Sequence, residues 1–188
     1  MKKYLFLFST IMIVFACKNK KKESLFPVLS FIKSQVAHVD TSLYPIKKIT
    51  WMDSTHTDTT YVKREEFRSL AKDFLKIPDL TDKKFRNLYT EEKFYDEGLN
   101  QVILTCKPKD PDAVSIQRQE VLITPDPSGD KVKSIIIDLS ITNKDSSVQK
   151  RMLWRVDQSF QVATIIQKNG QAEITSIMKV AWDEKDNE

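Results

Sequence analysis

The sequence predicts an α+β fold, with N-terminal amphipathic helices packed on a curved, half-barrel-like antiparallel β-meander sheet. Two segments before residue 77 carry apolar residues at three- and four-residue steps, which is the periodicity of an amphipathic helix. From Asn87 onward the period changes to two, which is typical of strands with one buried face. Helices that precede an unbroken run of strands indicate α+β rather than alternating α/β units.

The first sixteen residues have the form of a secretory signal peptide. A basic head, residues 1–3, is followed by a run in which only Ser9 and Thr10 are not apolar. The uncharged run from Tyr4 to Cys17 has 14 residues, whereas a helix that crosses a bilayer needs about 20. The segment therefore predicts secretion and removal of residues 1–16, and not a transmembrane anchor.

The residues around Cys17 resemble the lipobox of bacterial lipoproteins, with the sequence Val-Phe-Ala-Cys at positions 14–17. The resemblance implies that the Cys17 sulfur receives a diacylglyceryl group, that the chain is cut before Cys17, and that the new amine is acylated, for example with palmitate. One acyl chain gives only marginal membrane binding, whereas two or more hold a protein stably. A lipoprotein is therefore expected, and a secreted protein without lipid is the alternative.

The excess of positive over negative charge lies in the signal peptide and in the tether, residues 17–24. The whole chain carries +4, but residues 23–188 carry −2 once Lys2, Lys3 and the four tether lysines are left out. Those four are Lys18, Lys20, Lys21 and Lys22. A nucleic-acid partner would need a basic patch on the domain itself, so we expect none. Each tether lysine can instead gain about 1 kcal/mol beside an anionic membrane.

The tether also limits where the domain can act. Lys18 to Ser24 are seven residues, which span at most about 24 Å. By resemblance to the sorting signals of bacterial lipoproteins, Lys18 favours the outer membrane, because an Asp at that position favours retention at the inner membrane. The basic run before Glu23 differs from the early acidic residues of surface-exposed lipoproteins. The expected location is therefore the periplasmic face of the outer membrane, through a lipid anchor.

Residues 25–188 have the length of a single α+β domain. The chain has only three glycines, so long flexible linkers are not expected. Ser24 to Asp40 predicts the first helix, with Pro27 tolerated in its first turn. Its apolar stripe is Leu25, Val28, Leu29, Ile32, Val36 and Val39. The polar face has few lysines, which favours packing on the sheet over lying on a membrane.

The next segment, Tyr44 to Lys63, predicts two strands or one bent strand, with the polar run Asp53 to Thr60 as the turn. A second helix is expected over Arg64 to Lys76. Its inner face would consist of Phe67, Leu70, Ala71, Phe74 and Leu75. The Ile-Pro-Asp-Leu sequence at 77–80 ends it, because the residue before a proline disfavours helical geometry.

Seven alternating segments then predict an antiparallel meander. They cover residues 87–97, 100–109, 115–124, 131–142, 147–156, 159–168 and 171–182. Turn sequences separate them, of which Asn169-Gly170 is the strongest hairpin signal. In the fifth segment Val148, Met152, Trp154 and Val156 share one face, whereas Gln149, Arg151 and Arg155 share the other. One face of the sheet is therefore expected to contact water.

The chain has two histidines, and both have aspartates nearby in sequence. His38 is followed by Asp40, and His56 lies between Asp53 and Asp58. Such pairs can supply an acid/base site or metal ligands, but neither matches a known ligand spacing. Location at a helix end for His38 and on a polar turn for His56 is favoured. We therefore expect no metal, no cofactor and no catalytic residue.

Cys106 and the large aromatic residues are expected to lie in the core. Cys106 alternates with Val102 and Leu104, and no basic neighbour is placed to activate its thiol. It is also the only cysteine besides Cys17, so no intramolecular disulfide is expected once Cys17 is lipidated. The aromatic residues at strand positions are Trp51, Tyr95, Trp154, Phe160 and Trp182. A ligand groove lined by them is the alternative to core packing.

Three stretches resemble small uncharacterised lipoproteins of Bacteroidota: residues 30–46, 64–80 and 152–167. The order of elements is similar to that of the half-barrel lipid and lipoprotein carriers of the bacterial envelope, and such a likeness alone does not establish function. The expectation is a membrane-anchored, non-catalytic module that binds or scaffolds an envelope protein, a peptide or a lipid. The alternative is an envelope hydrolase that uses a His/Asp site.

Overall fold

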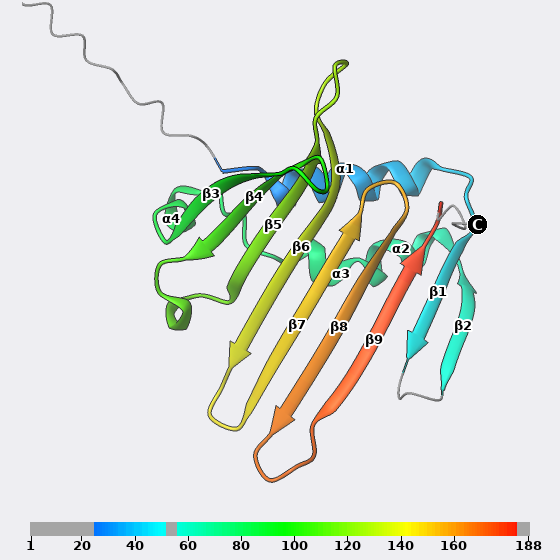
Figure 1. Cartoon of the computed structure of the whole chain (residues 1–188). Helices are drawn as coiled ribbons and strands as arrows, with labels where there is room; N and C mark the ends of the chain where they lie inside the picture. Colours follow the sequence, from blue (N-terminus) through cyan, green and yellow to red (C-terminus); the bar gives the residue numbers. More distant parts are fainter. Residues whose placement is uncertain (1–24, 52–55, 184–188) are drawn as a thin grey trace, which may run out of the picture.

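The computed structural model describes residues 25–51 and 56–183. Within these ranges the strands form one antiparallel sheet of nine strands in the order β2-β1-β9-β8-β7-β6-β5-β4-β3 (Figure 1). The strands are β1 Ile46–Trp51, β2 Thr57–Val62, β3 Tyr89–Asp96, β4 Gln101–Pro108, β5 Ile116–Thr124, β6 Lys131–Thr142, β7 Ser146–Arg155, β8 Ser159–Lys168 and β9 Ile174–Ala181. The sheet is not closed, and β2 and β3 are its two edges.

The predicted antiparallel meander is confirmed, because each of its seven segments corresponds to one of the strands β3 to β9, and consecutive strands pair. Strand β7 begins one residue before its predicted segment, at Ser146. The Asn169-Gly170 turn lies between β8 and β9, where Gly170 has a φ of 70°. The two strands predicted between Tyr44 and Lys63 are also present, as the antiparallel pair β1 and β2. Strand β2 begins at Thr57, so the predicted turn, Asp53 to Thr60, was too long. Threonine favours strands, which is why Thr57, Thr59 and Thr60 belong to β2 and not to the turn.

The first predicted helix is α1, Val28–Thr41, which begins after Pro27. Five of the six residues of the predicted apolar stripe are buried: Leu25, which precedes α1, and Val28, Ile32, Val36 and Val39 within it. The second predicted helix is divided at Ala71 into α2, Arg64–Leu70, and α3, Lys72–Leu75. Two shorter elements were not predicted, α4 at Lys83–Arg86 and the 3-10 helix η1 at Pro111–Ala113.

A cluster of aromatic side chains joins α2 and α3 to the sheet. The Phe67 ring of α2 lies 5.9 Å from Phe160 and 5.2 Å from Trp182, and the Phe74 ring of α3 lies 5.1 Å from Trp154, measured between ring centroids. All five side chains are buried. Trp154, Phe160 and Trp182 are therefore core residues and not a ligand groove. Trp51 and Tyr95 are not part of this cluster.

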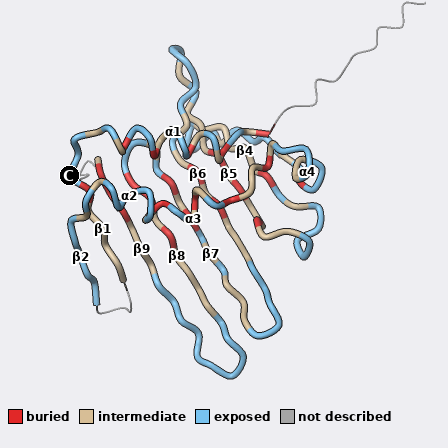
Figure 2. The backbone as a smooth tube through the Cα atoms, turned by 180° about the vertical axis from the view of Figure 1, so that it is seen from behind, coloured by how far each residue is buried: buried red, intermediate tan, exposed pale blue. Residues whose placement is uncertain are grey.

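The two faces of the sheet differ. Figure 2, viewed from behind, shows α1, α2 and α3 in front of the strands, and Figure 1 shows the opposite face without a helix over it. On β7, Met152 and Trp154 are buried, whereas Arg151 and Arg155 are exposed, as the alternation predicted. Lys150 shares the side of Trp154 and forms an ion pair of 2.8 Å with Asp73 of α3. We call the helix side the covered face and the other side the open face.

Cys106 lies on the covered face of β4 and is 2% exposed, as expected for a core cysteine. Burial raises the pKa of its thiol to about 12, and the carboxylate of Glu91, opposite it on β3, acts in the same direction. Burial also raises the pKa of Tyr89 to about 12. Both groups are therefore neutral at physiological pH, and the Cys106 thiol is not activated as a nucleophile.

Folding stability is expected to decrease in alkaline solution. The ordinary pKa values are 9.0 for cysteine and 10.0 for tyrosine, so the folded state holds both protons more tightly than the unfolded state. The stabilisation is complete below pH 9 and is lost as the pH rises towards 12. Cys106→Ala should cost about 1 kcal/mol at neutral pH and flatten the alkaline decrease. Urea unfolding at about pH 8 and about pH 10.5 measures both effects; equal pH slopes for the two proteins would contradict the assignment.

Candidate functional site

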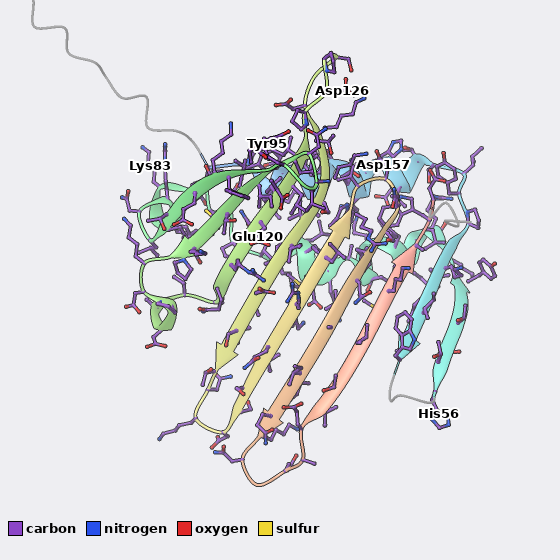
Figure 3. All side chains as sticks on the ribbon, viewed as in Figure 1. His56, Lys83, Tyr95, Glu120, Asp126 and Asp157 are labelled. Carbon is purple, nitrogen blue, oxygen red and sulfur yellow. The ribbon has the colours of Figure 1, made fainter. Side chains whose placement is uncertain are left out.

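The structure does not bring the two histidines together. His38 is exposed in the last turn of α1, which leads into the Ile46 end of β1. His56 lies at the other end of this hairpin, next to the Trp51 end of β1 (Figure 3). The length of β1 separates them, roughly 17 Å for a strand of this size. Asp58 is exposed on β2, and Asp53 lies outside the described residues.

The carboxylate closest in sequence to His38 has another partner. Asp40 forms an ion pair of 2.6 Å with Arg68 of α2. Among the residues that the structure describes, no three His, Cys, Asp or Glu side chains are grouped so that they could hold a metal ion. Within the described residues, the fold therefore does not form a site in which both histidines and a carboxylate meet, as the hydrolase alternative would use.

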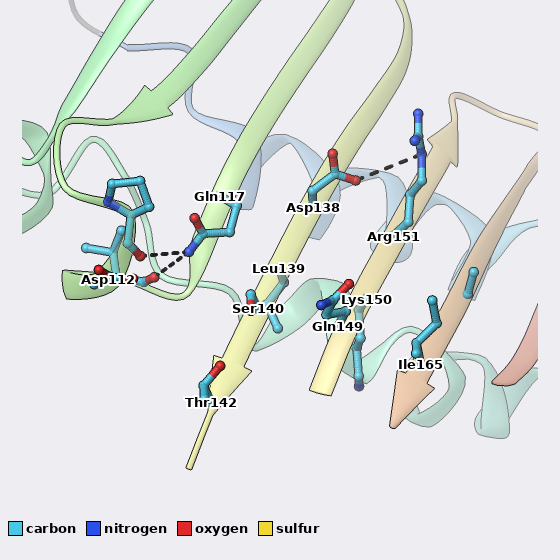
Figure 4. A pocket seen from close by; sticks show the side chains of 13 residues that line it. Asp112, Gln117, Asp138, Leu139, Ser140, Thr142, Gln149, Lys150, Arg151 and Ile165 are labelled. Atoms are coloured by element: carbon cyan, nitrogen blue, oxygen red, sulfur yellow. Dashed lines mark hydrogen bonds and ion pairs between the residues drawn. The ribbon is translucent and has the colours of Figure 1, made fainter. Parts of the chain in front are cut away.

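A groove of about 630 Å³ lies on the open face, over β6, β7 and β8 and beside η1 (Figure 4). Its lining combines amide, hydroxyl, carboxylate and guanidinium groups with a few apolar side chains. The lining residues are Pro111, Asp112, Val114, Gln117, Asp138, Leu139, Ser140, Thr142, Gln149, Lys150, Arg151, Ala163 and Ile165. We take this groove as the candidate functional site.

A β-bulge in β5 builds one wall of the groove. Ile116 pairs with Leu139 and Arg118 pairs with Asp138, so Gln117 is an extra residue in β5. The bulge places the fully buried Ile116 on the covered face and Arg118 on the open face, although residues two apart share a face in a regular strand. The Gln117 side-chain amide donates hydrogen bonds to the carbonyl oxygens of Pro111 (2.9 Å) and Val114 (2.8 Å). These bonds hold η1 beside the groove.

A row of charged side chains crosses the open face and enters the groove, which Asp138 and Arg151 line. Arg118, Asp138 and Arg151 are register neighbours on β5, β6 and β7. The Arg118 guanidinium donates a hydrogen bond from Nε to Asp138 Oδ2 at 2.9 Å, and its Nη2 forms an ion pair with the same oxygen at 2.8 Å. Arg151 Nε lies 3.9 Å from Asp138 Oδ1, and Glu120 is 3.3 Å from Arg118. Asp138 therefore lies between two guanidinium groups.

This charged row orients the site more than it stabilises the fold. Arg151 is 66% exposed at its side chain, and ion pairs at such positions contribute roughly 0–1 kcal/mol because water and salt screen them. The shared Asp138 nevertheless keeps the two guanidinium planes on the open face, where a ligand can reach them. None of these residues was a predicted site residue. The only sequence signal was the alternation of Gln149, Arg151 and Arg155 on β7.

The fold and the groove together place the chain in a broad structural class: an open antiparallel sheet of nine strands with a few short helices and a groove on one face. Comparison of the chain with models of protein families, with curated proteins and with solved structures found no match. None of the helices within the described ranges has the length and apolar character needed to cross a membrane. Function is therefore argued from the chain itself.

Proposed function

We propose that the protein is a membrane-anchored envelope lipoprotein that binds an envelope ligand, a protein, peptide or lipid, without catalysing a reaction. The observation that supports this most is the groove of about 630 Å³ on a sheet face that none of the helices in residues 25–51 and 56–183 covers. Residues from four strands, β5 to β8, and from the η1 segment line it, and neither histidine is among them. Binding sites commonly take this concave form with a few fixed polar groups.

The composition of the groove favours a protein or peptide over a lipid. More than half of its lining residues are polar or charged. Acyl chains need predominantly apolar walls, whereas protein partners are commonly bound by surfaces that mix polar and apolar groups. The half-barrel likeness to lipid and lipoprotein carriers remains part of this proposal and rests on the order of the elements.

The proposed anchor is the lipid on Cys17, which lies outside the described residues with the tether lysines Lys18, Lys20, Lys21 and Lys22. Where the tether joins the domain, Leu25 is buried and the backbone N–H of Phe26 donates to Glu91 on β3 at 3.4 Å. Because seven residues reach at most about 24 Å, the β3 edge of the sheet would lie nearest the outer membrane. The groove would then act close to the periplasmic surface of that membrane.

Site-specific crosslinking in intact envelopes tests the proposal. A photo-crosslinking amino acid is placed at Gln149, on the groove wall, and a matched control is placed at Ser69, exposed on α2. The expected result is a discrete adduct to one envelope component from Gln149 and none from Ser69. Equal adducts from both positions, or no adduct from Gln149 and from a second groove position such as Ala163, would contradict a binding function of the open face.

A further inference from the structure

We infer that the ligand of the open face is an acidic protein segment that carries apolar side chains between its carboxylates. This inference rests on the proposed function and specifies the chemistry of its ligand. The distribution of charge over four neighbouring strands carries it.

Strands β7, β8, β9 and β1 are neighbours in the sheet. Together they contain no aspartate or glutamate and seven cationic residues. The seven are Lys47, Lys48, Lys150, Arg151, Arg155, Lys168 and Lys179. The domain as a whole is slightly acidic, at −2 for residues 23–188. The four strands are therefore a local basic region within an acidic domain.

The register divides these cations between the two faces. Arg151 lies in one row with Ala163, Ile177 and Trp51, and Arg155 lies in the next with Ser159, Ala181 and Lys47. Lys179 pairs with Gln161, which pairs with Leu153. On β7, Arg151, Leu153 and Arg155 alternate with the buried Met152 and Trp154, so they point to the open face. Residues that are paired across the sheet point to the same face as their partners. The open face therefore carries Lys47, Arg151, Arg155 and Lys179.

The covered face takes the remaining three cations. Lys150 is neutralised there by Asp73, at 2.8 Å. Lys48 pairs with Val180, which is on the covered face. Lys168 is the last residue of β8 and is an even number of residues from Val162, so it points to the covered face as well. These two provide a matched control, because they belong to the same group of four strands and face the other way.

Among the residues that the structure describes, three carboxylates are placed near these strands and the open-face cations by the register or by shared contacts. Asp138, on β6, is shared between Arg118 and Arg151. Asp58 of β2 is opposite Thr50, which places it on the covered face. Asp183 follows β9 and lines a small hollow of about 290 Å³ with Lys47. Arg155 and Lys179 also interact within the protein. The positive character of the face therefore rests on the absence of Asp and Glu from the four strands themselves, with Lys47 and Arg151 as the cations that the test addresses.

Apolar side chains separate the cations and indicate what kind of anion fits. Leu153 lies between Arg151 and Arg155, and Ile49, Trp51 and Ile177 are partly accessible on the same face. Neighbouring positions on such a face are about 5 Å apart between strands and about 7 Å apart along a strand. A polypeptide that alternates carboxylates with apolar residues matches both features. Phosphate backbones and headgroup layers offer the charge without the interleaved apolar groups.

Binding of a synthetic peptide by the full lipidated chain, held in nanodiscs of neutral lipid, tests the inference. The probe is a fluorescent peptide in which Glu alternates with Leu and Thr, compared with a matched peptide that has Gln in place of Glu. Two double variants are compared: Lys47→Gln/Arg151→Gln on the open face and Lys48→Gln/Lys168→Gln on the covered face. A labelled DNA duplex and phosphatidylglycerol vesicles are measured in parallel.

The acidic peptide should bind the wild type more tightly than the Gln peptide, and added salt should reduce the difference. The open-face double variant should bind it about threefold to tenfold more weakly, and the covered-face variant less than about twofold more weakly. Equal affinities for the two peptides, equal losses in the two variants, or tighter binding of DNA or anionic vesicles than of the acidic peptide would overturn the inference.

The crosslinking experiment distinguishes failure of the inference from failure of the proposed function. If the Gln149 envelope adduct forms equally in the open-face variant, the inference fails and the binding function stands. If no groove position gives an adduct, the proposed function itself fails.

Discussion

Replacement of Trp154 by alanine should lower the free energy of unfolding by about 3–5 kcal/mol. The Trp154 side chain is fully buried and contacts Phe74, Phe160 and Trp182, with ring centroids 5.1, 5.3 and 5.6 Å away. Its removal would leave a cavity where α3 meets the sheet, and it would also remove the aromatic contacts on three sides. Urea unfolding monitored by circular dichroism measures the loss.

Two further variants separate packing from other effects. The Trp154 indole N–H has no hydrogen-bond partner among the described residues, so Trp154→Phe loses volume without losing a hydrogen bond and should cost clearly less than the alanine change. Tyr61→Ala is the surface control, because Tyr61 is 73% exposed, and it should shift stability by less than about 0.5 kcal/mol. Similar losses for Trp154→Ala and Tyr61→Ala would show that the cluster does not hold the helices on the sheet.

Replacement of Cys17 by serine should abolish lipid attachment. The proposed lipid is bound through the cysteine sulfur, so Cys17→Ser leaves no acylation site, and the precursor should keep its signal peptide. Two or more acyl chains hold a protein on a membrane far more firmly than one, so their loss should be a nearly complete effect and not a graded one. Metabolic labelling with radioactive palmitate, together with the size of the product, measures it.

Lys18→Gln serves as the matched control for Cys17→Ser, because it changes the neighbouring tether residue and keeps the sulfur. It should be labelled and processed like the wild type. Normal palmitate labelling of Cys17→Ser would assign the lipid to another residue, and normal processing without any labelling of the wild type would indicate a secreted protein without lipid.

The local elements of this fold could be predicted because each repeats a simple pattern. Val148, Met152 and Trp154 alternate with Gln149 and Arg151. This alternation predicts both that the segment is a strand and which of its side chains point into the core. The stripe of α1 and the inner face of α2 and α3 follow in the same way from a helical period. The division at Ala71 was not predicted, because apolar spacing continues across it to Phe74.

The groove could not be predicted, because its parts are distant in sequence. Arg118 reaches Asp138 only because the bulge at Gln117 turns Arg118 to the open face, and a bulge leaves no mark in an otherwise alternating segment. The excess of cations on β7, β8, β9 and β1 is visible in the sequence. It becomes a surface only through the pairing of β1 with β9, which brings residues about 130 positions apart into contact.

This pairing of β1 with β9 also determines when the sheet can be completed. Seven strands, β3 to β9, can add to one another in chain order, because each pairs with the strand before it. The hairpin of β1 and β2 has no sheet partner until the last strand exists, and an isolated two-stranded hairpin is marginally stable in water. The nine-stranded sheet therefore cannot be completed before β9 has been synthesised, and the part of the open face that joins Lys47 of β1 to Lys179 of β9 arises only then.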